Sequence, residues 1–360
     1  MREGWNIMRL SDVCDMYQPK TISKKMLVPD GKYPVFGANG VIGKYNEFNH
    51  AEPQLLVTCR GATCGSVNIS QPYSWINGNA MVVKPKGDNL ITNYLKYFFQ
   101  GGVNFSEVIT GSAQPQITRQ SLNPLSIPIP SIEEQKEIVS ILDDAFASIN
   151  KAKANIERNI ENAKELFQSK LNEIFSQTGE RWKEKRFKDV CVLQRGFDLP
   201  KRLREKGKYD LVTSSGIKDS HVDYKVEGPG VVTGRSGSIG NVFYIHNNFW
   251  PLNTSLYIKD FKENNERYIY YFLKSFDLSR YSSGSGVPTL NRNFVHDELV
   301  VSTINIQEQK EIVTILDKLN ELTQSSISNY EKELENLEEL NKSILQKAFS
   351  GELTNKSVAA

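Results

Sequence analysis

The feature that most constrains this 360-residue sequence is an internal repeat. The hexapeptide EQKEIV occurs at residues 134–139 and again at residues 308–313, and each copy continues into Ile-Leu-Asp one residue later. Weaker matches keep the same order at an offset between 173 and 177: Asp12, Val13 and Cys14 with Asp189, Val190 and Cys191, Thr58 and Arg60 with Thr233 and Arg235, Trp75 with Trp250, and Arg119 with Arg292. This period is much longer than that of solenoids or propellers. The pattern therefore predicts a duplicated two-part unit with an internal pseudo-twofold axis.

Charge divides each copy into two parts. Residues 1–130 carry 12 Lys and Arg against 8 Asp and Glu, whereas residues 131–176 carry 6 against 9. In the second copy, residues 177–304 carry 20 against 15, and residues 305–351 carry 5 against 9. We therefore expect two basic globular domains, 1–130 and 177–304, two acidic helical segments, 131–176 and 305–351, and a tail at 352–360.

The acidic segments have the signals of long helices. Ser131 can cap the first helix, with Glu134 as its reciprocal partner, and Asn305 and Glu308 repeat this pair. Gly351 predicts the end of the second helix.

Apolar residues recur in these segments at heptad spacing. We expect a packed seam at Leu142, Ile149, Ile156 and Ala163, a second at Ala145, Ala152 and Leu166, and a wider stripe that includes Ile160, Phe167 and Ile174. The second copy repeats the seam at Leu316, Tyr330, Leu337 and Ile344. A continuous helix of this length would extend about 65–70 Å, more than a small head can cover. The sequence therefore predicts that the two helices form an antiparallel coiled coil, with separate bundle helices or an intermolecular coiled coil as alternatives.

The basic segments alternate short apolar runs with turn residues. Strands are predicted at residues 33–37, 54–58, 80–84, 230–233 and 255–259. An amphipathic helix with inward aromatic residues is expected near 91–100 and again near 265–276. The expected fold class is α+β, in which two mixed α/β heads are joined by the helical pair.

An arginine follows a predicted strand in both heads and opens a glycine-rich loop. Its planar fork can bind phosphate or the N7 and O6 edge of guanine. Hydroxyl side chains of these loops can donate to phosphate. The candidate residues are Arg60, Thr63 and Ser66 in the first head and Arg235, Ser236 and Ser238 in the second. A tight turn alone would also explain the glycines.

A second pair of polar loops, 111–119 and 284–292, contains amides that can read adenine. Its candidate residues are Gln114, Gln116, Arg119, Asn291 and Arg292. The basic cluster Lys201, Arg202 and Arg204 suits binding to the DNA backbone, although such clusters are more often solvated surface. These contacts compete on even terms with ordinary turn chemistry.

Motifs for catalysis are missing from the sequence. It contains no Walker loop, HExxH or GxSxG motif, and residues 123–126 only superficially resemble the catalytic loop of amino-methyltransferases. Four dispersed cysteines and four dispersed histidines argue against a zinc site or a disulfide framework. No apolar stretch is long enough for a membrane span, and the N-terminus lacks a secretory signal. We expect a non-catalytic binding protein of the cytoplasm, with no cofactor or metal of its own.

Three passages resemble the specificity subunits of type I restriction–modification enzymes. They are IPIPSIEEQKEI at residues 127–138, GSAQPQI at residues 111–117 and NKSILQKAFSGEL at residues 341–353. The resemblance extends over nearly the whole chain in the order head, helix, head, helix. One departure is that residues 300–305, before the second helix, lack the prolines of the first copy.

The resemblance implies that each head is a target recognition domain for one half of a bipartite, asymmetric site on double-stranded DNA. The helices would set the gap between the half-sites and dock two DNA adenine methyltransferase subunits, which would bind S-adenosylmethionine. Restriction subunits would add ATP- and Mg²⁺-dependent translocation and cleavage. Two alternatives are a two-headed lectin-like or peptide-binding scaffold, which would not bind DNA in a salt-dependent manner, and the recognition half of a fused methyltransferase, which would be active without partners.

Overall fold

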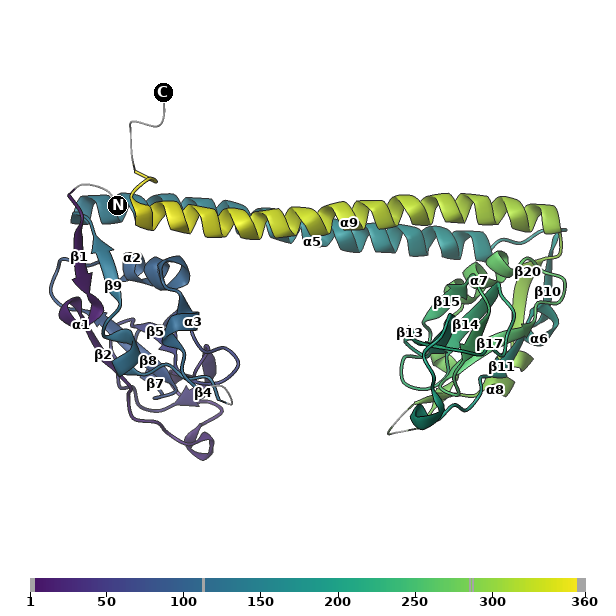
Figure 1. Ribbon diagram of the computed structural model, residues 1–360, viewed down its shortest axis with the longest axis horizontal. Helices are drawn as coiled ribbons and strands as arrows, with labels where there is room; N and C mark the ends of the chain where they lie inside the picture. The colour runs from purple at the N-terminus through teal and green to yellow at the C-terminus, as the bar shows by residue number, and fades with distance from the viewer. Residues whose placement is uncertain (1–3, 112–113, 285, 287, 355–360) are drawn as a thin grey trace, which may run out of the picture. The chain divides into compact units, whose positions relative to one another are not determined.

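The computed structural model describes residues 4–111, 114–284, 286 and 288–354 (Figure 1). The chain divides into two compact units, one formed by Met1–Ile156 with Lys332–Ala360 and the other by Glu157–Glu331. Parts of the second loop pair (Ser112, Ala113, Ser285 and Val287) and residues 355–360 of the predicted tail lie outside the described residues.

The first unit contains a head whose described residues form three small sheets. An antiparallel sheet has the order β2 (Cys14–Tyr17), β8 (Ala80–Pro85), β5 (Leu55–Thr58) and β6 (Val67–Ile69). A second sheet has the order β4 (Val41–Tyr45), β3 (Tyr33–Phe36) and β7 (Trp75–Ile76), and β3 and β7 are parallel. Strand β1 (Asn6–Arg9) pairs with β9 (Ser126–Ile129). The short helical segments are α1 (Leu10–Val13), η1 (Lys24–Met26), α2 (Thr92–Tyr97), η2 (Phe98–Gly102), α3 (Phe105–Val108) and α4 (Arg119–Leu122).

The head of the second unit repeats this topology. Its sheets have the orders β11 (Val192–Arg195), β17 (Ser255–Asp260), β14 (Gly230–Gly234), β15 (Val242–Ile245), and β13 (Gly216–His221), β12 (Tyr209–Thr213), β16 (Phe249–Pro251). Strand β10 (Trp182–Arg186) pairs with β20 (Leu299–Thr303), and β18 (Ser282–Ser283) pairs with β19 (Thr289–Leu290). Its helical segments are α6 (Phe187–Val190), η3 (Lys201–Leu203), α7 (Glu266–Ser275), η4 (Leu278–Tyr281) and α8 (Arg292–Asp297). The equal strand orders confirm the duplication and the mixed α/β heads.

Aromatic side chains of α2 and the following η2 in the first head, and of α7 in the second, are buried in the core of each head. Tyr94 and Phe99 in the first head and Tyr268 and Tyr271 in the second are fully buried. They belong to two hydrophobic clusters, one in each unit. The prediction that these aromatic residues face the core, rather than forming a stacking platform, is confirmed.

Two long helices, α5 (Ile132–Phe175) and α9 (Ile306–Ser350), pack antiparallel. Within the first unit, Leu142 of α5 shares a buried cluster with Leu345 and Ala348 of α9, and Lys153 lies 3.5 Å from Glu338. Within the second unit, Leu171 of α5 shares a cluster with Leu316 of α9. The predicted intramolecular pair is confirmed.

One residue of the predicted seam is wrong. Leu166 is 65% exposed, whereas Phe167 and Ile174 are buried as predicted, together with Leu171. A straight α-helix has 3.6 residues per turn and drifts from a strict heptad. In the second unit, the packed face of α5 therefore follows positions 167, 171 and 174, and Leu166 points to solvent.

The glutamine of the repeated hexapeptide ties each head to its long helix. Gln135 is fully buried; its Oε1 accepts from the Ile91 N–H at 2.9 Å and its Nε2 donates to the Asn89 carbonyl at 2.9 Å. Gln309, also fully buried, accepts from the Asn265 N–H at 2.9 Å and donates to Asn264 Oδ1 at 2.6 Å. A buried amide with satisfied donors and acceptors fixes one geometry. The glutamines therefore define the attachment of head to helix.

The neighbouring glutamates complete this attachment. Glu134 accepts from the Trp5 indole at 3.1 Å and from the Thr354 hydroxyl at 2.6 Å. Glu308 accepts from the Trp182 indole at 3.3 Å and from the Thr303 hydroxyl at 2.6 Å. The predicted N-cap residues are confirmed, because Ser131 Oγ and Asn305 Oδ1 accept backbone N–H groups of the first turn of each helix. The reciprocal bond expected of Glu308 is not formed, because the Asn305 N–H donates to Thr303 Oγ1 at 3.2 Å. The contacts of both carboxylates with Trp and Thr were not anticipated.

Candidate nucleic-acid interface

Backbone hydrogen bonds join the two predicted polar loops of each head. In the first head, the N–H of Ile117 donates to Cys59 at 2.9 Å, beside Arg60 at the end of β5. In the second head, the N–H of Leu290 donates to the carbonyl of Arg235 at 2.8 Å, after β14. The structure thus brings together the loop pairs that the sequence placed about 50 residues apart.

The last position of β14 requires glycine. A Cβ on Gly234 would lie 1.8 Å from the carbonyl oxygen of Ser238, so any other residue would push the loop away from the strand. The loop folds back through Gly237, whose φ of +85° favours glycine. These glycines hold Arg235 at the strand end, with its N–H bonded to the Thr254 carbonyl at 2.9 Å.

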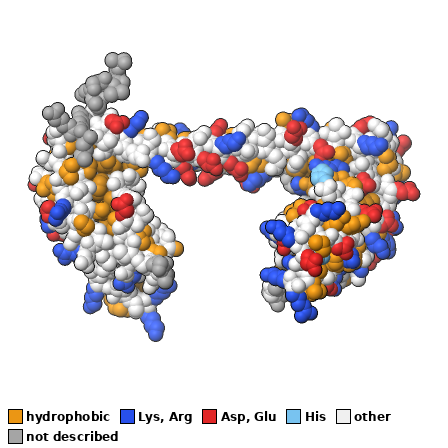
Figure 2. Space-filling view, viewed as in Figure 1, with side chains coloured by type: hydrophobic (Ala, Val, Ile, Leu, Met, Phe, Trp, Pro, Cys, Tyr) orange, Lys and Arg blue, Asp and Glu red, His pale blue; other side chains and the backbone are white. Residues whose placement is uncertain are grey.

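The second head contains a basic hollow of about 390 Å³, which we call the arginine hollow. It is lined by Arg195, Arg235, Leu256, Ser283, Thr289, Leu290, Asn291, Arg292 and Asn293. Three of the predicted residues, Arg235, Asn291 and Arg292, lie here together. Lys and Arg side chains are visible on the surface of this head in Figure 2.

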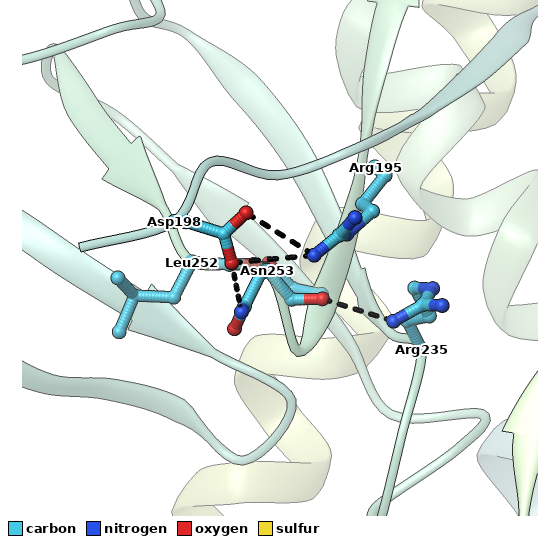
Figure 3. Close-up of polar contacts among 6 residues, drawn as sticks. Arg195, Asp198, Arg235, Leu252 and Asn253 are labelled. Atoms are coloured by element: carbon cyan, nitrogen blue, oxygen red, sulfur yellow. Dashed lines mark hydrogen bonds and ion pairs between the residues drawn. The ribbon is translucent and has the colours of Figure 1, made fainter. Parts of the chain in front are cut away.

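A polar network connects two arginines of the hollow (Figure 3). Arg195 Nη2 donates to both oxygens of Asp198, at 3.2 and 3.3 Å. The side-chain amide of Asn253 donates to Asp198, and the backbone carbonyl of Asn253 accepts from Arg235 Nη1 at 3.3 Å. Asp198 therefore neutralises one guanidinium. In the described part of the chain, neither Arg235 nor Arg292 has a carboxylate within ion-pair distance.

The excess positive charge affects a neighbouring histidine. Burial and the charge of Arg292 lower the pKa of His296 on α8. Its Nε2 accepts from the N–H of Leu193 at 3.0 Å, which requires an unprotonated nitrogen. His296 therefore links α8, which begins at Arg292, to β11, which ends at Arg195.

Other predicted residues of the second head have structural roles or lie apart. Asn291 caps α8 by accepting from the Asn293 N–H at 3.1 Å. Ser236 pairs with Thr289 through the backbone, and Ser238 is half-buried in the turn. Lys201 and Arg202 are exposed on η3, and Arg204 donates to the Leu199 carbonyl at 3.2 Å. None of Lys201, Arg202 and Arg204 lines the arginine hollow.

The predicted residues of the first head lie on its surface loops. Arg60, Thr63, Gln114 and Arg119 are exposed, whereas Ser66 and Gln116 are half-buried. Gln116 pairs through its backbone with both Arg60 and Thr110. Arg119 opens α4, whose N-terminus is capped by Thr118 and Ser121. These side chains remain candidates for contact with DNA.

Sequence reasoning missed Arg195, Asp198 and Asn253. Arg195 has no arginine counterpart in the first copy, because Gln18 occupies the corresponding position after β2. No strand was predicted at Val192–Arg195, so the position of Arg195 at the end of β11 was not expected.

Other chemistry is limited in the described part of the chain. No group of three or more His, Cys, Asp and Glu side chains could hold a metal ion there. The four cysteines are free thiols, and burial raises the pKa of Cys14 to about 12 and that of Cys59 to about 11. No described helix is both long and apolar enough to cross a bilayer.

The fold and the paired loops define a two-headed binding protein, and comparisons with known proteins identify its class. A family model described as "Type I restriction modification DNA specificity domain" matches residues 2–162 and 179–336. The chain belongs to this family. It is a DNA specificity subunit of a type I restriction–modification system, and this subunit is the non-catalytic one.

Several relatives resemble the chain over much of its length. A putative type I specificity subunit of Mycoplasma pneumoniae is 24% identical, and the match covers 91% of this chain and 92% of the relative. The MjaIX specificity subunit of Methanocaldococcus jannaschii is 25% identical over 83% of this chain and 77% of its own. A solved chain of a type I system, reported in a study of complex assembly and conformational transition, is similar in fold, with a TM-score of 0.79, 15% identity and coverage of 98% and 99%.

Proposed function

We propose that each head reads one half of a bipartite, asymmetric sequence in double-stranded DNA. The observation that carries this proposal is the same strand order in two heads, each with an arginine loop bonded to a second polar loop. The heads share the same strand order, but the side chains of their loops differ. Two different half-sites can therefore be read by equivalent surfaces. The domain limits we propose for the heads are 1–130 and 177–304.

The long helices would set the spacing between half-sites and dock two adenine methyltransferase subunits. Each helix runs from one unit into the other and carries more acidic than basic residues. Asp and Glu side chains gather along them (Figure 2). Acidic surfaces favour a protein partner over the DNA backbone. Restriction subunits would join the same complex in the cytoplasm, and S-adenosylmethionine, ATP and Mg²⁺ would be bound by the partners.

Exchange of one head tests this proposal. Residues 1–130 would be replaced by the corresponding head of a relative, and the complex with the methyltransferase that co-purifies with the chain would be used to map methylated sites. We expect one half-site to change and the other to remain. A simultaneous change of both half-sites would contradict independent heads.

Salt dependence separates this function from a scaffold that does not bind DNA. Binding through several Lys and Arg contacts to phosphate weakens steeply as salt rises. The affinity of the complex for duplex DNA should fall by at least tenfold between about 50 and 200 mM salt. Absence of measurable DNA binding at low salt would favour the scaffold.

A further inference from the structure

The arginine hollow contains guanidinium groups in two different electrostatic settings. Arg195 is bonded to a carboxylate, whereas Arg235 and Arg292 have none within ion-pair distance among the described residues. A guanidinium without a carboxylate attracts phosphate strongly. One that is already neutralised attracts phosphate much less, because the anion would also approach the carboxylate.

The contact with Asp198 also leaves much of the Arg195 fork available. Asp198 engages Nη2 alone, and no hydrogen bond from Nε or Nη1 occurs within the described residues. Guanidinium has five N–H donors, and paired donors match the N7 and O6 acceptors of guanine. A fixed arginine loses less side-chain entropy on binding than a free one. Asp198 is itself held by the amide of Asn253.

We infer that Arg195, held by Asp198, reads a guanine in the half-site of the second head. This inference rests on the proposed function of that head. Asp198 lies next to the fork and can accept from the N4 amine of the cytosine paired with this guanine. Arg235 and Arg292, at the same hollow, bind the neighbouring phosphates. Arg195 is thus a specificity-determining residue, and the two other arginines supply affinity.

The first head differs at the corresponding positions. Gln18 stands where Arg195 does, and its amide donates to the Gly78 carbonyl at 2.8 Å. Thr21 stands where Asp198 does, and its hydroxyl accepts from the Gly78 N–H at 3.0 Å. The arginine–carboxylate pair belongs to the second head alone, so the guanine contact is confined to one half-site.

The test uses the full chain in complex with its co-purifying methyltransferase. A library of double-stranded oligonucleotides with randomised blocks is selected for binding, and methylation motifs are mapped in parallel. Arg195→Met removes the fork, Arg195→Lys keeps the charge but loses paired donation, and Asp198→Asn releases the fork. Arg186→Met is the matched control: Arg186 is on β10, does not line the hollow, and its removal also costs one positive charge in this head.

We expect the wild-type motif to contain an invariant guanine in one half-site. Both Arg195 variants should lower the preference for guanine at that position by about tenfold or more, and Asp198→Asn by less, while the other half-site stays unchanged. Arg186→Met should keep the full motif. Melting temperatures close to wild type for Arg195→Lys would show that the head remains folded.

Other outcomes overturn the inference. If both Arg195 variants recognised the unchanged motif, Arg195 would not read a base. If they lost affinity equally for all DNA sequences, Arg195 would be a phosphate contact. A wild-type motif without a guanine in either half would also contradict it. A wild-type complex with no sequence preference would instead contradict the proposed function, before any variant is made.

Discussion

At the scale of single residues, the repeated glutamine shows how sequence identity can mark architecture rather than ligand binding. Gln135 and Gln309 are fully buried and bond the backbone before α2 or α7. The loops that differ between the copies contain the candidate DNA contacts. The two identical glutamines therefore support the frame, whereas loop side chains that differ between the heads are suited to reading different bases.

Replacement of Gln309 by Met should destabilise the second unit. The Asn265 N–H, the Asn264 side-chain carbonyl and the Thr303 carbonyl would lose the partner that Gln309 gives them. An unsatisfied buried group costs about 1–3 kcal/mol, so we expect a loss near 2–3 kcal/mol in urea unfolding. The exposed neighbour Gln307→Met is the control and should change stability by less than about 0.5 kcal/mol. Equal effects would contradict the role of the buried amide.

Acidification should weaken the fold through His296. Its pKa is lowered by burial and then by the charge of Arg292. Below its ordinary value of 6.5 the unfolded chain binds a proton before the folded chain does, so the free energy of unfolding decreases as pH falls from about 6.5 through the lowered pKa. His50 has a pKa shifted in the same direction, by burial and then by Lys84. His296→Asn should reduce the slope of stability between pH 6.5 and 5; an unchanged slope would contradict this origin.

At the scale of elements, strands and helices could be predicted well because their patterns are local. Residues 80–84 became β8 and residues 265–276 became α7. The error at Leu166 arose because a heptad template fixes the packed face, whereas the actual face follows the partner residues on α9. The hollow could not be predicted, because Arg195, Arg235 and Arg292 come from segments that only the sheet order and the loop hydrogen bonds bring together.

Two leucines of α5 test which face of the helix is packed. Leu171 is fully buried and Leu166 is 65% exposed. Replacement of each by alanine therefore compares a buried and an exposed leucine on the same helix. Leu171→Ala should lower the free energy of unfolding by about 2–5 kcal/mol. Leu166→Ala should change it by less than about 0.5 kcal/mol. If urea titrations gave comparable losses of unfolding free energy for both variants, Leu166 would belong to the packed seam.

At the scale of the whole molecule, the two copies also differ in how each head is fixed to its long helix. Arg267 of α7 pairs with Asp317 of α9 at 2.8 Å and stacks over the rings of Tyr244 and Tyr270. The corresponding residue of the first head is Asn93, which cannot form this ion pair. Each head is thus fixed to its long helix by an equivalent buried glutamine, Gln135 or Gln309, and by additional contacts that differ between the heads.

The proposed ruler predicts that the spacing of the recognised sequence depends on helix length. Insertion of one heptad at corresponding places in both α5 and α9 would lengthen each helix by about 10 Å, which is about three base pairs of DNA. Mapping of methylated sites should show the same two half-sites separated by a longer gap. An unchanged gap in a folded variant would contradict the ruler.

The first unit is discontinuous in the chain, and this has a consequence for biosynthesis. Leu345 and Ala348 fill its core, and Thr354 bonds Glu134, whereas Glu157–Glu331 form the other unit without interruption. At about 5–20 residues per second, a ribosome needs roughly 10 to 35 seconds to translate that intervening stretch. During this delay the nascent N-terminal head exposes an apolar surface that only the last part of the polypeptide can cover. Chaperone protection should therefore matter most for the portion that is made first.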